Sequence, residues 1–232
     1  MAMRTAALGR KQLSGRAHSR SASAQPDLDG PRRPARPLNA EASAMTLPDV
    51  LIPTYVQMLR ALSAWLDKAE MQRPGGEAET LLSARLAVDM FPLSTQIRFA
   101  CVQAQEGVFR LRREALPPLV AVLLDEGRNA AERPGSMAEA RTRIAETVAV
   151  VEALAADMPT VDPEMPIAHA LPQGMVFDLS AGQYVRDWAL PQFYFHVMIA
   201  YTILRAQGVE LGKADYVAHM FAYLRPGTLP SQ

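Results

Sequence analysis

The 232-residue sequence contains a single cysteine, Cys101, and only 6% aromatic residues. One cysteine excludes an intrachain disulfide, and such chains are typical of a reducing cytoplasm, where we expect this protein. Cys101 lies in the apolar stretch 97–102, which favours a small buried side chain over a catalytic nucleophile. No apolar run approaches the roughly 18 residues that a membrane-spanning helix needs, so we expect no association with a membrane.

The sequence also lacks the motifs of familiar catalytic sites. It contains no Gly-x-Ser-x-Gly, His-Glu-x-x-His, Cys-x-x-Cys or Gly-x-Gly-x-x-Gly pattern. The glycines and Lys213 of residues 208–215 do not follow the order of a phosphate-binding loop and instead predict a turn that fixes the C-terminal segment. Whether the chain is an enzyme therefore stays open at this stage.

Formal charge balances over the whole chain but not along it. Residues 1–44 hold eight basic and three acidic residues, a net charge of +5, and the remainder therefore carries −5. A mildly acidic body argues against nucleic-acid binding by the folded part.

Residues 1–44 differ in composition from the rest of the chain. They are rich in Arg, Ser, Ala, Pro and Gly and contain no aromatic residue. Such a segment cannot bury enough apolar surface to offset the entropy lost on ordering, so we predict a disordered, basic N-terminal extension. It is a mis-assigned translation start with the true start at Met45, a basic arm, or a transit peptide, and we favour the first.

Residues 45–232 read as one domain of four helices and a hairpin. Thr46 is suited to cap a first helix, Pro92 to open a second, and the Ser136–Glu139 capping box to begin a third. Pro191 is placed to open the fourth. Each helix carries an apolar stripe at helical period, and its members are Tyr55, Leu59, Leu62 and Leu66; Leu93, Ile97, Ala100, Ala104, Val108 and Leu111; Ile144, Val148, Val151 and Ala155; and Phe193, Val197, Ala200 and Leu204.

Two short segments before the fourth helix indicate strands. Residues 167–171 and 175–179 flank Pro-Gln-Gly and predict a small β-hairpin, and Gly208 is placed to end the fourth helix. Residues 117–135 have no clear assignment. The fold class predicted is therefore all-α, a four-helix bundle with a β-hairpin before the last long helix.

Two separated stretches resemble a known family. Residues 81–93, together with 193–196 and 212–216, are similar to an uncharacterised bacterial family, a domain of unknown function grouped with the DinB/YfiT-like metalloenzyme superfamily. The resemblance extends over roughly residues 46–217. It implies a DinB-like four-helix bundle, often a homodimer, with a pocket between helices, and it implies no known reaction.

The resemblance also implies what a metal site would need. In metal-binding relatives, one histidine of the second helix joins two histidines spaced i, i+4 on the fourth, because residues four apart share a helix face. His196 corresponds to the first of that pair, but Ala200 stands in the i+4 position. No histidine lies between Pro92 and Arg113. We therefore expect no cofactor, with zinc or nickel at His196, the only candidate ligand, as the alternative.

We place the candidate ligand-binding pocket between the second and fourth helices. His196, Gln96, Asp89 and Tyr201 are its expected lining residues, since bundle sites gather polar groups from facing helices. The structural alternatives are a buried neutral histidine, an Asp89 that caps the helix or pairs with Arg85, and an aromatic core residue at position 201. Neither His169, in the predicted hairpin, nor His219 is expected to join His196.

Three hypotheses of function follow. The favoured one is a DinB-like bundle without the three-histidine metal site that binds a small molecule or a partner in an inter-helix pocket. The second is a metal-dependent hydrolase or thiol-transferase with a degenerate site around His196. The third is a structural homodimer formed by apolar helix faces.

Overall fold

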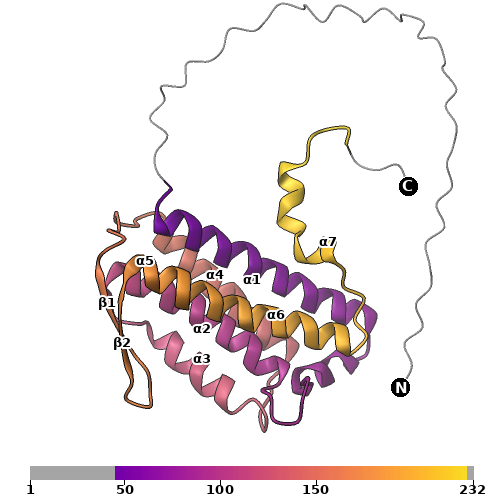
Figure 1. Cartoon of the computed structure of the whole chain (residues 1–232). Helices are drawn as coiled ribbons and strands as arrows, with labels where there is room; N and C mark the ends of the chain where they lie inside the picture. The colour runs from indigo at the N-terminus through magenta and orange to yellow at the C-terminus, as the bar shows by residue number, and fades with distance from the viewer. Residues whose placement is uncertain (1–44, 229–232) are drawn as a thin grey trace, which may run out of the picture. The chain divides into compact units, whose positions relative to one another are not determined.

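The computed structural model describes residues 45–228, so the predicted disorder of residues 1–44 lies outside the described part of the chain. Four long helices form the bundle, as Figure 1 shows: α1 (Leu47–Gln72), α2 (Leu93–Arg112), α4 (Met137–Ala155) and α6 (Leu190–Ala206). The shorter elements are η1 (Glu77–Ser83), α3 (Pro118–Arg128), β1 (Pro166–Ala170), β2 (Val176–Ser180), α5 (Ala181–Gln183), η2 (Tyr184–Ala189), α7 (Lys213–Tyr216) and η3 (Ala218–Tyr223).

The four long helices contact one another around a shared core. α2 packs against both α4 and α6, and α1 packs against the same two helices. α3 lies along α2, outside the four (Figure 1). The predicted bundle with a hairpin before its last long helix is therefore confirmed. Among residues 45–228, no helix combines the length and apolarity required to cross a bilayer.

Local signals begin and end the helices where the sequence places them. Thr46 Oγ1 accepts from the Asp49 backbone N–H at 3.3 Å, and the Asp49 carboxylate accepts from the Thr46 N–H at 2.9 Å. Ser136 and Glu139 form the same reciprocal box at the start of α4. These bonds satisfy backbone donors that a helix start otherwise leaves unpaired. Gly208 follows α6 with a φ of 83°, a conformation that glycine adopts at little cost.

The predicted apolar stripes form the core. Leu59, Leu62 and Leu66 of α1 are fully buried, and each such burial stabilises the fold by about 1.5–3 kcal/mol. Tyr55 of α1 meets Phe193 of α6 edge-on, with ring centroids 4.6 Å apart. The helical period of the sequence thus predicted the faces that meet in the bundle.

Cys101 lies in the interior of α2 and is fully buried. Burial raises the pKa of its thiol to about 12, even though the Thr147 hydroxyl and two arginines favour the thiolate. The thiol is therefore protonated at neutral pH, and thiolate is the nucleophilic form of cysteine. The expectation of a buried, unreactive cysteine agrees with this environment.

Residues 117–135, which had no clear assignment, contain helix α3. Thr95 of α2 donates to the Gly127 carbonyl oxygen at 2.8 Å in a buried contact. A Cβ on Gly127 would meet the Phe99 ring Cδ1 at 2.8 Å, so only glycine permits this close approach of α3 to α2. The glycine that seemed to interrupt the helix is instead required where two helices touch.

The hairpin pairs β1 and β2 antiparallel, with His169 opposite Phe177. Burial alternates along β1, so that Ile167 and His169 face the bundle. The fourth helix begins earlier than predicted, since α5, η2 and α6 form one continuous helical stretch. The π-type turn of η2 lies directly before Pro191, whose missing N–H and ring bulk an ordinary α-helical turn would not accommodate.

Candidate functional site

α2 and α6 bring His196 and Gln96 together. His196 Nδ1 lies 2.9 Å from Gln96 Oε1 in a buried contact. Gln96 Nε2 donates to the Phe91 carbonyl oxygen at 3.3 Å, which fixes the orientation of the amide. Because Gln96 Oε1 can only accept, Nδ1 of His196 carries the proton and donates it, and Nε2 keeps its lone pair. The sequence predicted these two residues to share a site, and they are hydrogen-bonded partners.

Aromatic rings surround the imidazole of His196. Phe99 and Phe195 meet it edge-on, with centroid distances of 5.4 and 5.3 Å. The side chain is 8% exposed, and burial lowers the pKa of His196 to about 4. The imidazole is therefore neutral at physiological pH, and its surroundings are apolar apart from Gln96.

The surroundings of His196 do not supply further metal ligands. Ala200, one turn further along α6, is fully buried. Within residues 45–228, no group of three or more His, Cys, Asp or Glu side chains is close enough together to hold a metal ion. The donors available at this point are one imidazole nitrogen and a glutamine amide already engaged in two hydrogen bonds.

Asp89 lies apart from this pair. It is exposed, in the loop between η1 and α2. The expected ion pair between Arg85 and Asp89 is wrong: residues 84–92 are not helical, so an i, i+4 spacing does not place the two side chains on one face. No ion pair of either side chain forms with the described residues.

Tyr201 belongs to an aromatic cluster that holds the C-terminal segment. Its ring lies 5.2 Å from that of Trp65 on α1 and 6.0 Å from that of Tyr216 on α7. The Trp65 indole donates to the Asp215 carbonyl oxygen at 3.1 Å, and Lys68 pairs with the Asp215 carboxylate at 3.1 Å. The predicted turn around Lys213 is thus fixed to α1 by Asp215, and Tyr201 contributes to that attachment.

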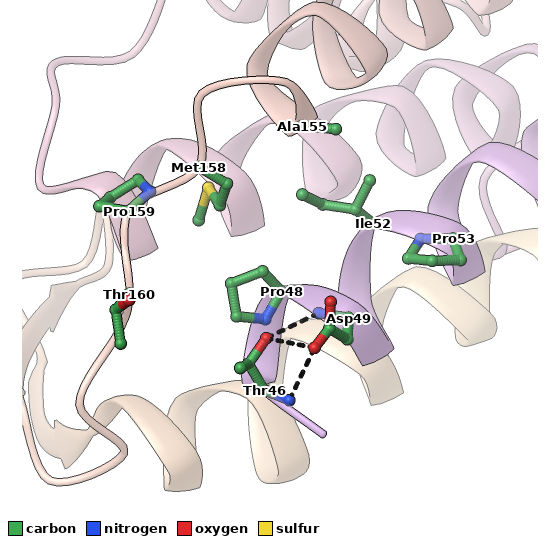
Figure 2. A pocket seen from close by; sticks show the side chains of 9 residues that line it. All are labelled: Thr46, Pro48, Asp49, Ile52, Pro53, Ala155, Met158, Pro159 and Thr160. Atoms are coloured by element: carbon green, nitrogen blue, oxygen red, sulfur yellow. Dashed lines mark hydrogen bonds between the residues drawn. The ribbon is translucent and has the colours of Figure 1, made fainter. Parts of the chain in front are cut away.

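A cavity of about 330 Å³ opens beside the start of α1 (Figure 2). Ile52, Pro53 and Met158 form much of its apolar lining. Its main polar groups, Thr46 and Asp49, are hydrogen-bonded to each other in the capping box, as the dashed lines in Figure 2 indicate. Because these groups already have partners, the cavity offers little to orient a ligand.

A second cavity, of about 320 Å³, lies between α2, α3, the hairpin turn and η2. We call it the hairpin cavity. Its apolar lining comes from α2, α3, the loop before α3 and the hairpin turn, and comprises Val102, Leu116, Val120, Leu124, Ala170, Leu171 and Pro172. Its polar or aromatic lining residues are Gln103, Glu106, Arg110, Arg128, His169 and Trp188. Apolar walls with a few convergent polar groups are typical of small-molecule sites.

Several polar atoms in the wall of the hairpin cavity have no hydrogen-bond partner. They are both ring nitrogens of His169, the indole nitrogen of Trp188 and Oε1 of Gln103, all shielded from solvent. His169 is 2% exposed, and its Nδ1 lies 4.0 Å from Glu106 Oε1, too far for a hydrogen bond. Burial and the Arg110 charge lower the pKa of His169, against the opposing effect of Glu106. His169 is therefore a buried, neutral and unpartnered imidazole.

Sequence reasoning did not identify the hairpin cavity. It placed His169 in the hairpin but gave it no role, because the cavity joins residues that lie far apart in the chain. One local signal was available: in an alternating strand, Ile167 and His169 share a face. A histidine on the apolar face of a short strand next to an aromatic-rich helix start is the pattern that would have found it.

Comparisons with known proteins agree with the fold and with the resemblance noted in the sequence. Residues 47–217 match the family model described as a domain of unknown function (DUF1993). Among solved structures, the chain is similar to a DinB family member from Shewanella denitrificans, with 31% sequence identity and a TM-score of 0.58. That match covers 79% of this chain and 96% of the other. No curated protein matches the sequence. The family match includes all four long helices and the hairpin, and the chain therefore belongs to the DUF1993 family, with a DinB-like four-helix bundle as its fold.

Proposed function

We propose that this protein binds a small molecule in the hairpin cavity and does so without the three-histidine metal site of metal-binding DinB-like relatives. The observation that carries the proposal is the set of unpartnered polar atoms on His169, Trp188 and Gln103. A buried polar group without a partner costs about 1–3 kcal/mol, and folded proteins contain few of them. Three such side chains in the wall of one cavity favour a site that a ligand completes.

The binding pocket predicted from the sequence moves in this proposal. His196 and Gln96 satisfy each other, whereas the polar groups of the hairpin cavity lack partners. The hairpin covers those groups from solvent, and only Ile167 and His169 of β1 face the bundle. A small displacement of the hairpin would expose the nitrogens of His169 to the cavity. We therefore assign the pocket to the α2–α3–hairpin side of the bundle rather than to the α2–α6 contact.

The test is a fragment screen by ligand-observed NMR on the full chain, with two tryptophan variants as filters. Leu116→Trp fills the mouth of the cavity. Val122→Trp is its control, because Val122 is 41% exposed against 39% for Leu116 and does not line the cavity. We expect fragments that bind the wild type and Val122→Trp but not Leu116→Trp. Hits that ignore Leu116→Trp, or an absence of hits, would contradict the proposal.

A second candidate function concerns His196, and a different observation favours it. Since Nδ1 donates to Gln96, Nε2 is left as a free lone pair, the arrangement in which an oriented imidazole binds a metal or takes up a proton. A hydrolase or thiol-transferase built on His196 would need ligands beyond those assembled here. Elemental mass spectrometry of protein purified without tag or chelator decides: about one zinc or nickel per chain, lost in His196→Ala, would support this candidate.

A further inference from the structure

We propose that the ligand of the hairpin cavity is a small organic anion: a carboxylate on an apolar body. This inference rests on the proposed function and specifies the chemistry of that same site.

The charges around the cavity favour an anion. Glu106 and Arg110, both on α2, are bonded to each other, since Arg110 Nε and Nη2 donate to Glu106 Oε1 at 2.9 and 2.6 Å. Their charges offset one another. Arg128, in the last turn of α3, also lines the cavity and forms no ion pair with any described residue. The lining therefore holds one uncompensated positive charge.

The unpartnered groups favour an acceptor as the ligand's polar end. The indole nitrogen of Trp188 can only donate, and a neutral imidazole such as that of His169 has one N–H to donate. The side-chain amide of Gln103 adapts to either role by rotating through 180°. Two N–H donors and one guanidinium match the two acceptor oxygens of a carboxylate, which forms its strongest hydrogen bonds with charged donors.

The remaining walls favour an apolar body of limited size. Val102, Val120 and Leu124 provide an aliphatic surface, and the Trp188 ring provides an aromatic one. The cavity volume of about 320 Å³ is near the lower end of the range for small-molecule sites. An aryl or short-chain aliphatic carboxylate satisfies both the volume and the walls. A cationic ligand would instead meet Arg128 without compensation.

The experiment compares phenylacetate with phenylacetamide, which have the same shape but differ in charge. Binding to the full chain is followed by tryptophan fluorescence in a Trp65→Phe background, where Trp188 is the remaining reporter. We expect phenylacetate to bind about tenfold more tightly than the amide, the ratio that one charge-assisted contact provides. Added salt should reduce this preference, because the Arg128 side chain is open to solvent.

Two arginine variants locate the charge that is recognised. Arg128→Gln should abolish the preference for phenylacetate. Arg133→Gln is the matched control, since Arg133 is likewise exposed, lies close behind α3, forms no ion pair with described residues and does not line this cavity. The control should keep the preference. A preference that survives Arg128→Gln overturns the assignment of Arg128.

The outcomes separate the ligand class from the proposed function. If the amide binds as well as the acid, or if phenethylamine binds more tightly than both, the anionic class is wrong while binding in the cavity stands. The class is also wrong if neither probe binds and other fragments still pass the Leu116→Trp filter. If no fragment passes that filter, the proposed function itself fails.

Discussion

His169 packs its ring against Trp188 with centroids 4.4 Å apart, and the polar atoms of both rings are left without hydrogen-bond partners. Two aromatic side chains in contact usually stabilise a fold, and a buried tryptophan or histidine usually finds a partner for its N–H. Here the packing is retained and the hydrogen bonds are missing. The contact therefore trades stability for two donors held at the wall of a cavity.

Replacement of His169 by phenylalanine should leave stability unchanged or raise it by about 1 kcal/mol. Removing a polar group that has no partner, with its shape kept, relieves a cost rather than losing a bond. His196→Phe is the matched comparison, because it removes a hydrogen bond that is made and leaves Gln96 Oε1 buried without a partner. We expect that variant to lose about 1–3 kcal/mol. Urea unfolding of both variants measures the difference.

The two histidine variants should also differ in binding. His169→Phe removes a donor from the hairpin cavity and should weaken fragment binding, although the fold is no less stable. His196→Phe should leave the affinity of the folded protein unchanged. The opposite result would move the site back to the α2–α6 contact.

Stability should fall as the pH drops below 6.5. Burial lowers the pKa of His196 from 6.5 to about 4, so between these values the unfolded chain binds a proton that the folded chain excludes. The stabilisation is complete above pH 6.5, and a loss on the order of 3 kcal/mol accumulates by pH 4. His196→Asn should flatten this slope in part, since the lowered pKa of His169 contributes to it as well. An equally steep slope in His196→Asn, measured by urea unfolding from pH 7 to 5, would disprove the assignment.

Substitution of Gln96 by glutamate should convert the His196 contact into an ion pair. A carboxylate at the position of Gln96 Oε1, 2.9 Å from Nδ1, would favour the imidazolium and raise the pKa of His196 by about 1–3. The histidine resonances in an NMR pH titration report this directly. Gln103→Glu is the control, because it places the same charge on α2 beside the hairpin cavity and should leave the titration of His196 in place. An unchanged pKa in Gln96→Glu would mean that the two side chains do not touch.

Homodimerisation remains a prediction, and exposed aromatic residues around His196 indicate where to test it. Phe91 and Phe195 are 52% and 54% exposed, and single apolar residues on a surface are common but clusters often mark interfaces. If this face forms the dimer, Phe195→Asp should shift the full chain to monomer in analytical ultracentrifugation. Phe221→Asp is the control, since Phe221 is equally exposed at 54% but lies on η3. A wild-type chain that is monomeric at high concentration would refute the dimer.

The elements that the sequence predicted are those governed by local rules. The box at Ser136 and the stripes on the long helices depend on residues a few positions apart, and both are present in the structure. His196 and Gln96 are 100 positions apart, but each lay on a predicted buried helix face, so their meeting followed from the bundle itself. α3 was missed because Gly127 reads as a helix breaker, and its close contact with Phe99 cannot be recognised without the fold.

The candidate site was harder to predict than the fold. The hairpin cavity depends on how β1 lies across α2, and no spacing in the sequence encodes that placement. Asp89 was included because it precedes a helix, yet its loop turns the side chain to solvent. Polar residues on rigid helix faces could thus be placed from sequence, while those on loops and on the hairpin could not.

The burial of Cys101 makes the protein a reporter of its own opening. As the only thiol in the chain, it gives a labelling reagent one possible point of attack, and the pKa of about 12 keeps that thiol protonated while α2 stays packed. Labelling at neutral pH then requires α2 to separate from its neighbours, and the labelling rate follows the population of opened molecules. A ligand that binds the closed bundle would slow the reaction in proportion to its occupancy. Screening for ligands of this protein can therefore be carried out by following the modification of one atom, with no knowledge of the reaction that the protein performs.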